Sequence, residues 1–257
     1  MLTFSLKDLN IYISQRSDGD FRELPSVQSF LEEQFTQDRL LHLELENSNK
    51  VIILEKEDLV VKKTLQVFTG DAILTNLKAG ERGTNKTLMS MVLGDCFPLI
   101  FFDQKSKNIA MIHAGWEPLY LGILDRVWQE ILALWQTRTE HLWVFLGPGI
   151  RAQSYRVNTE PRQSQHPQWQ KYIKKIAQKQ QKSDGERWQI DLPAFIKDFL
   201  NTHALPKEQL IDSKLDTYAL KKEFFSYRRS QEHLAEGEKH LSQVNNGRFF
   251  VVCRLPS

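Results

Sequence analysis

Two residue types that carry chemistry occur close together near the middle of the chain, a cysteine at position 96 and a histidine at position 113. Each stands where an apolar run meets a turn, and a hairpin is expected between them. A thiolate beside an imidazole can act as a nucleophile with its base, or as two ligands of a zinc-like ion that keeps a position open for water. Cys96 and His113 are therefore the predicted catalytic and metal-binding residues.

Apolar runs on either side of this pair predict the strands that position it. Residues 87–93, 97–102 and 109–112 are almost wholly apolar, as strands covered on both faces are. Cys96 and His113 then occupy strand ends, where loops leave the sheet. Shorter strands are predicted at 8–14, 71–76, 143–146, 210–211 and 248–254.

The first third of the chain contains a further predicted hairpin. Residues 41–45 and 51–54 flank a turn at Asn47-Ser48-Asn49, which favours two strands joined by that turn. Residues 59–61 are expected to extend the same sheet.

Apolar residues at helical spacing predict helices over 27–35, 120–135 and 192–200, and Asp191 is positioned to cap the last of them. The charged segment at about 230–246 lacks a core face, so we expect an exposed polar insertion between two strands. No internal repeat or linker stands out. Strands mixed with helices predict one α/β (α+β) domain over residues 1–257.

Composition and charge narrow the classes of protein. With 257 residues and 41% hydrophobic content, the chain can bury a sizeable core. A net charge of +2 gives no reason to expect nucleic acid or an anionic membrane as a partner. Two distant cysteines, Cys96 and Cys253, suit a reducing compartment. We find neither a signal peptide nor an apolar stretch of the ~20 residues that a spanning helix needs, so a cytoplasmic protein is expected.

Five short motifs occur in the order found in one known family. They are Asp-Ala-Ile-Leu-Thr at 71–75, Gly-Asp-Cys-Phe-Pro at 94–98, His-Ala-Gly-Trp at 113–116, Gly-Pro-Gly-Ile at 147–150, and Phe-Ser-Tyr-Arg-Arg at 225–229 followed by Gly-Arg at 247–248. On these motifs the sequence resembles the laccase-domain proteins, also called multicopper polyphenol oxidases and zinc-dependent purine nucleoside phosphorylases/adenosine deaminases. The resemblance implies mixed β-sheets in a sandwich with helices on the outside.

The resemblance also implies a metal held by two histidines and one cysteine. Cys96 and His113 match two of these ligands. The family's Gln-Val-His-x-x-x-Val motif falls on residues 45–51 and puts Asn47 where the other histidine belongs. Zinc is thus the expected cofactor, with weak or absent binding, because a neutral amide is a poor ligand beside imidazole. Copper is less expected, since the chain has too few histidines to hold several copper ions.

Two alternatives concern the missing ligand. An alignment on Gln66-Val67-Phe68 would place a phenylalanine at the ligand position, and phenylalanine cannot bind metal. His42 or another residue would have to replace Asn47 for the ligand set to be complete.

Other family positions have changed as well. Glu117 and Pro118 replace the usual Arg-Gly after the His-Ala-Gly-Trp motif, which reverses a charge beside the site. Arg156 stands where the family has Glu, and Asp216 stands where it has Cys. Several changes at one site suggest altered or lost activity.

Arg16 and Arg228 remain as predicted contacts for phosphate or substrate, and Asn47 joins them as a predicted substrate-binding residue.

Three hypotheses about the function follow from these residues. The chain is an enzyme of the family's type that acts on a purine nucleoside, with phosphate, at a Cys96–His113 metal site. Alternatively, a metal-free Cys96–His113 pair works as a hydrolase or acyl-transfer catalyst on the same fold. The third hypothesis is a catalytically degenerate binding or regulatory protein.

Overall fold

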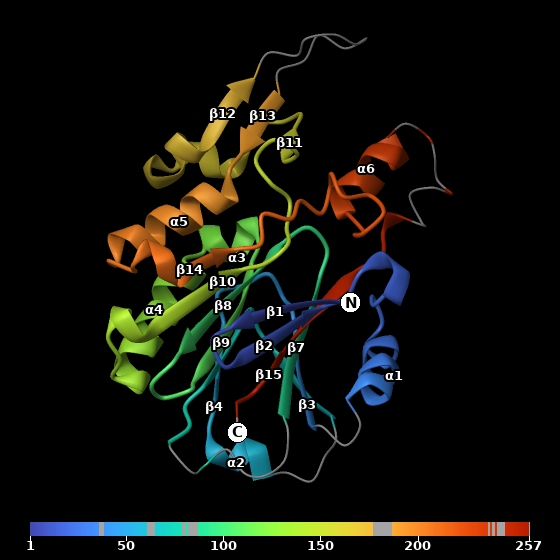
Figure 1. Ribbon diagram of the computed structural model, residues 1–257. Coiled ribbons are helices and arrows are strands. Elements are labelled where there is room, and N and C mark those ends of the chain that lie inside the picture. The colour runs from blue at the N-terminus through green and yellow to red at the C-terminus, as the bar shows by residue number, and fades with distance from the viewer. Residues whose placement is uncertain are drawn as a thin grey trace.

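The computed structural model describes residues 1–35, 39–60, 65–78, 81, 87–176, 187–235, 237, 240 and 245–256, and these form two six-stranded sheets and one three-stranded sheet (Figure 1). The first sheet has the order β1 (Leu2–Leu6), β2 (Leu9–Ile13), β15 (Phe249–Arg254), β7 (Thr87–Leu93), β3 (Arg39–Glu44) and β5 (Leu65–Thr69). The second has the order β14 (Leu210–Asp212), β10 (Leu142–Leu146), β8 (Phe97–Asp103), β9 (Ile109–Ala114), β6 (Ala72–Thr75) and β4 (Val51–Leu54). The small sheet has the order β11 (Arg156–Val157), β13 (Arg187–Ile190) and β12 (Ile173–Ile176).

Both large sheets mix parallel and antiparallel pairs, and their inner faces pack against each other. In β8, Ile100 and Phe102 belong to the core between the sheets, whereas Leu99 and Phe101 belong to the core on the outer side. Every residue of β8 is buried. Burial on both faces explains why the sequence of this strand is an unbroken apolar run.

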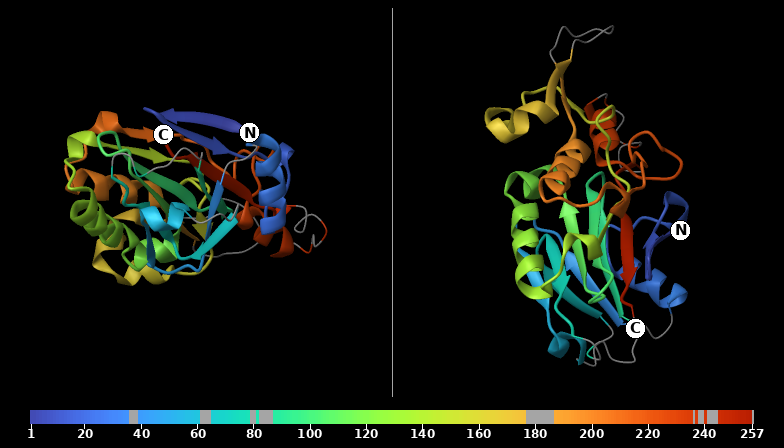
Figure 2. Two further views of the ribbon diagram at one scale, coloured as in Figure 1. Left: turned by 90° about the horizontal axis from the view of Figure 1, so that it is seen from below. Right: turned by 60° about the vertical axis from the view of Figure 1, so that its left-hand side comes forward.

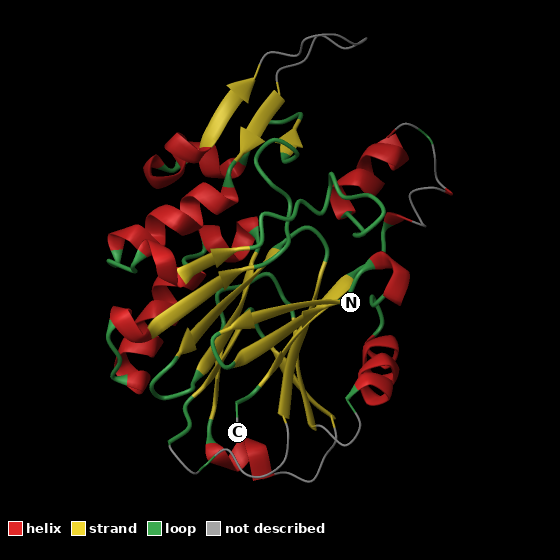
Figure 3. Ribbon diagram, viewed as in Figure 1, coloured by secondary structure: helices red, strands yellow, loops and turns green. Residues whose placement is uncertain are grey.

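Helices cover the outer faces. α4 (Ile123–Trp135) and α5 (Leu192–Thr202) share one apolar core with the second sheet, and α1 (Leu24–Gln34) shares another with the first sheet. Figures 2 and 3 show these helices outside the strands. The shorter helices are α2 (Lys56–Val60), α3 (Trp116–Tyr120) and α6 (Tyr227–Ala235), with 3-10 turns at Arg16–Asp18, Thr139–His141, Arg162–Gln165, Pro167–Tyr172 and Lys207–Gln209.

The predicted α/β (α+β) fold of mixed sheets with outer helices is confirmed. β8 and β9 form the expected antiparallel hairpin, with Phe97 opposite Ala114. The Asp191 side chain caps α5 as predicted, because it accepts a hydrogen bond of 2.9 Å from the N–H of Ala194.

The hairpin predicted for 41–45 and 51–54 is wrong. β3 pairs in parallel with β5 and β7 in the first sheet, whereas β4 pairs in parallel with β6 in the second. The five residues from Arg39 to Leu43 are buried, so hydrophobic alternation could not reveal which strand lies beside them. Residues 45–50 therefore cross from one sheet to the other, and this crossing carries Asn47 to the site described below.

The strand predicted at 59–61 is also wrong for its described residues, because Lys56–Val60 is helix α2. Asp58 accepts a hydrogen bond from the N–H of Glu55, which stabilises the start of this helix. Residue 61 lies outside the described residues. In the predicted insertion at 230–246, α6 occupies the first part, and residues 236, 238–239 and 241–244 lie outside the described residues. No helix in the described ranges is long and apolar enough to cross a membrane.

Candidate active site

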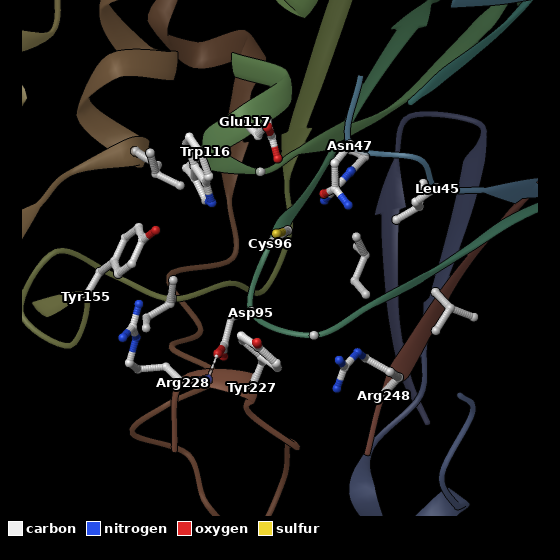
Figure 4. A pocket seen from close by; sticks show the side chains of 17 residues that line it. Leu45, Asn47, Asp95, Cys96, Trp116, Glu117, Tyr155, Tyr227, Arg228 and Arg248 are labelled. Atoms are coloured by element: carbon white, nitrogen blue, oxygen red, sulfur yellow. Dashed lines mark hydrogen bonds between the residues drawn. The ribbon is translucent and has the colours of Figure 1, made fainter. Parts of the chain in front are cut away.

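A pocket of about 470 Å³ lies where β7 ends, β8 begins and β9 ends, between the edges of the two large sheets (Figure 4). Its walls come from segments far apart in the sequence, namely Leu45, Asn47, Val92–Cys96, His113, Gly115–Glu117, Ile150, Tyr155, Leu192, Tyr227, Arg228 and Arg248. Four of the five predicted site residues meet here, namely Cys96, His113, Asn47 and Arg228, and Arg16 does not.

Cys96 and His113 face each other across Gly115. A Cβ atom added at Gly115 would lie 2.8 Å from Nε2 of His113 and 2.9 Å from Sγ of Cys96. Nε2 of His113 and Sγ of Cys96 therefore both lie next to the position that a Cβ atom of residue 115 would occupy. Only glycine fits there without displacing one of them. The β8–β9 hairpin brings Cys96 and His113 together, and Gly115, at the turn before α3, leaves room for their side chains.

The second nitrogen of His113 is held by Asp71. Nδ1 donates to Oδ1 of Asp71 over 2.8 Å, and both side chains are almost fully buried. Burial would lower the pKa of His113, but the charges and hydrogen bonds of Cys96 and Asp71 raise it to about 9. Burial opposes ionisation of Asp71, yet hydrogen bonds from His113 and Ser48 hold its pKa below the ordinary range. The three residues form a Cys–His–Asp line.

The same Asp71 carboxylate anchors the turn that carries Asn47. It accepts hydrogen bonds from the N–H of Asn47 at 3.1 Å, and from the N–H and Oγ of Ser48 at 2.6 and 2.8 Å. Asn47 takes the left-handed backbone conformation, with φ 58°, which asparagine tolerates better than most residues. Its exposed side chain lines the pocket. The turn thus brings Asn47 to the pocket that also contains Cys96 and His113.

A second buried aspartate, Asp95, holds the turn before Cys96. Its backbone is left-handed, with φ 82°. The carboxylate accepts hydrogen bonds from Oγ1 of Thr217 at 2.7 Å, Oγ of Ser226 at 2.9 Å and the N–H of Arg228 at 2.6 Å. Burial raises the pKa of this carboxyl, and the three hydrogen bonds oppose that rise. Asp95 therefore joins the turn that carries the thiol to the first turn of α6.

The two arginines of the pocket occupy separate corners (Figure 4). The Arg228 guanidinium lies 5.6 Å from the ring centre of Tyr155, and the Arg248 guanidinium lies 5.5 Å from that of Tyr227. The stem of Arg248 crosses Gly94 so closely that a Cβ there would lie 2.4 Å from its Cδ atom. Gly94 is thus required for the path of Arg248.

Aromatic and acidic groups complete the walls. Trp116 and Tyr155 lie on one side of Cys96, where flat rings suit a heterocyclic ligand (Figure 4). The Glu117 side chain points into the pocket on the same side of Cys96 as Asn47. Burial raises the pKa of Tyr155, so this phenol keeps its proton and can donate a hydrogen bond.

Arg16, His42 and Phe68 do not line this pocket. The Arg16 guanidinium lies 5.0 Å from the ring centre of Phe225, and its Nη1 donates to the carbonyl of Lys221 and the side chain of Asn245. His42 lies on β3 with Nδ1 2.9 Å from Oγ of Ser90, so it does not take the place of Asn47. Phe68 lies on β5, at the edge of the first sheet.

Sequence reasoning missed the roles of Asp71, Asp95 and Arg248, although all three stand in the motifs quoted above. The signal available was an acidic residue at the start of an apolar run, where burial without a partner is costly. Their partners lie up to 228 residues away, so no local pattern identifies them.

A model of the family described as "Multi-copper polyphenol oxidoreductase laccase" matches residues 24–239. The chain belongs to this laccase family. It is 26% identical over 153 residues to a Shigella flexneri protein named purine nucleoside phosphorylase YfiH, an alignment that covers 60% of this chain and 58% of that protein. It is 27% identical over 182 residues to a Staphylococcus aureus protein named purine nucleoside phosphorylase YlmD, covering 71% and 64% respectively. The chain thus aligns with less than two thirds of the length of either relative.

Solved structures of similar proteins agree with the fold. The crystal structure of YlmD from Geobacillus stearothermophilus has a TM-score of 0.72 and 17% identity, covering 98% of this chain and 93% of that one. At this identity the likeness shows the laccase-family fold alone.

The laccase family's description names copper, and a metal centre needs a suitable set of donor atoms. Cys96 and His113 offer sulphur and nitrogen, and Asn47 adds a neutral amide. Within the described ranges no group of three or more His, Cys, Asp or Glu side chains could hold a metal ion. A catalytic zinc uses three protein ligands and a set of copper ions uses several imidazoles. The residues do not fit either metal centre.

Proposed function

We propose that this laccase-family chain cleaves the N-glycosidic bond of a purine nucleoside in the Cys96–His113 pocket. One observation carries the proposal, namely the convergence of the Cys96–His113–Asp71 line with the flat rings of Trp116 and Tyr155. The names of the Shigella and Staphylococcus relatives support the substrate class. The substrate is a small molecule, and phosphate is the second reactant that those names imply.

Each group of the pocket has a task in that reaction. Trp116 and Tyr155 hold the purine between aromatic surfaces. When the bond from the sugar C1′ to the purine breaks, the base leaves with an electron pair and needs a proton. His113, charged at neutral pH and held by Asp71, supplies that proton from Nε2. Asp95 fixes the Cys96 turn, and the sulphur of Cys96 favours the charged form of the His113 imidazole beside it.

No step in this reaction is assigned to a metal. With Asn47 in place of the third ligand, zinc binding at Cys96 and His113 is expected to be weak or absent, and copper binding is expected less still. Metal analysis of protein purified without chelator tests this expectation, and about one zinc per chain would contradict it.

A second candidate is a metal-free hydrolase or acyl-transfer enzyme that uses Cys96 as its nucleophile. The Asp71–His113 hydrogen bond favours it, because a nucleophile, a base and a group that orients the base are the elements of a catalytic triad. Burst release of the alcohol from an activated ester, together with a covalent adduct on Cys96, would support this candidate.

The deciding experiment incubates the purified chain with adenosine, inosine and guanosine and measures free base by chromatography. We expect base release that His113→Ala lowers at least 100-fold, while His166→Gln, at an exposed histidine, leaves it unchanged. Nucleoside binding without release would instead indicate a binding protein, and neither binding nor release would contradict the substrate class.

We also propose a cytoplasmic location. Both cysteines are free thiols, Cys96 half-buried and Cys253 in the core, and free thiols are usual in reducing compartments.

A further inference from the structure

The Glu117 carboxylate is the one acidic group of the pocket, among its described lining residues, that has no partner. Asp95 also lines the pocket, but its oxygens already accept three hydrogen bonds. The side chain of Glu117 makes no hydrogen bond or ion pair within the described part of the chain, and the residue is only half-buried. A half-buried carboxylate without a protein partner is free to accept a hydrogen bond from a ligand or a water molecule.

Glu117 lies close to the reacting pair. It follows Gly115 by two residues, and Gly115 is the point around which Cys96 and His113 converge. α3 begins at Trp116, so the first turn of this helix aims Glu117 back over the pocket. Figure 4 shows its side chain and that of Asn47 pointing toward the same space beside Cys96.

A carboxylate and an amide that face one space can hold a water molecule between them. The carboxylate accepts a hydrogen bond from the water, and the amide of Asn47 fixes its orientation. The same carboxylate repels a phosphate dianion. Arg228 and Arg248 lie in separate corners of the pocket, away from Glu117 and Asn47 (Figure 4), and the cation beside Cys96, His113, is already paired with Asp71.

We propose that the chain uses water rather than phosphate as the acceptor of the ribosyl group, with Glu117 as the general base. The inference rests on the proposed cleavage of a purine nucleoside. The bond from C1′ to the purine nitrogen breaks, and the oxygen of water forms a new bond to C1′. Glu117 takes the proton of the water and His113 gives one to the base, so the products are free ribose and free purine. Glu117 also stabilises the positive charge that develops on the sugar in the transition state.

The first test measures free base, ribose and ribose 1-phosphate from the same incubation, with and without phosphate. The phosphate is added at about 10 mM, which is well above a dissociation constant of about 1 mM, so that even a weak phosphate site is filled. We expect release without added phosphate, a rate that phosphate changes less than twofold, and free ribose as the sugar product. Release that requires phosphate and yields ribose 1-phosphate would overturn this inference and leave the proposed function standing. Absence of release in both incubations would instead overturn the proposed function.

The second test isolates Glu117. Glu117→Gln keeps the shape of the side chain and removes the base, so kcat should fall about 100-fold, as for loss of a general base, while KM changes less than threefold. Glu208→Gln, at an exposed acid on the 3-10 turn Lys207–Gln209, is the matched control. A Glu117→Gln variant that folds normally and keeps kcat within threefold of the parent would overturn the role of Glu117.

Discussion

Nδ1 of His113 lies 2.8 Å from Oδ1 of Asp71, and the same carboxylate accepts the N–H of Asn47. One buried acid therefore sets two positions of the pocket, the imidazole of His113 and the turn that carries Asn47. Asp95 does the same for the other half of the site, because it fixes the turn before Cys96 and the N–H of Arg228. Asp71 and Asp95 therefore fix the shape of the pocket through their buried hydrogen bonds.

Asp71→Asn should separate the charge of the carboxylate from its position. The amide cannot stabilise the charged imidazolium, so the pKa of His113 should fall from about 9. Less charge on His113 means less stabilisation of the Cys96 thiolate, and alkylation of Cys96 by iodoacetamide at pH 7 should slow about tenfold or more. Asp125→Asn, on the exposed face of α4, should leave the rate unchanged. An unchanged rate in Asp71→Asn would contradict this account.

Asn47→His should complete a three-ligand metal site, because Asp71 already anchors the turn in the required conformation. We expect zinc content to rise to about one per chain in protein refolded with zinc, and the melting temperature to rise with added zinc. Asn201→His, on the exposed surface of α5, is the control. If Asn47→His binds no more zinc than this control, the turn does not point the side chain at Cys96 and His113.

The sequence predicted well those features that depend on neighbours along the chain. The strands β7, β8 and β9 are buried on both faces, so their apolar runs are visible locally, and their hairpin brings Cys96 and His113 together. The partner of β3 was predicted wrongly, since strand pairing depends on residues distant in the chain.

The roles of Asp71 and Asp95 could not be predicted from the sequence for the same reason. Asp71 meets His113 after 42 residues and Asp95 meets Thr217 after 122 residues. Nothing in the composition around either acid shows which donors surround it. Glu117 was recognised as a charge reversal, but only the pocket geometry shows that its carboxylate and the Asn47 amide face one space.

His42 should make the protein sensitive to acid. Burial lowers its pKa from 6.5 to about 4, so between these pH values the unfolded chain binds a proton that the folded chain does not. Stability should therefore fall as pH drops from 6.5 toward 4, by up to about 1.4 kcal/mol for each pH unit. His42→Gln keeps a partner for Ser90 and should flatten this part of the urea-unfolding profile relative to the parent. Equal slopes in the two proteins would show that His42 does not titrate in this range.

Asp95→Asn and Asp95→Ala should differ sharply, because the role of Asp95 is to position Cys96 and Arg228. Asparagine tolerates the left-handed backbone at φ 82° and can still accept from the N–H of Arg228. Alanine loses all three hydrogen bonds and strains the turn, at a cost of about 1–3 kcal/mol or more. We expect alkylation of Cys96 to stay within threefold of the parent in Asp95→Asn and to change at least tenfold in Asp95→Ala, measured where both remain folded. Equal effects would show that Asp95 acts through its charge.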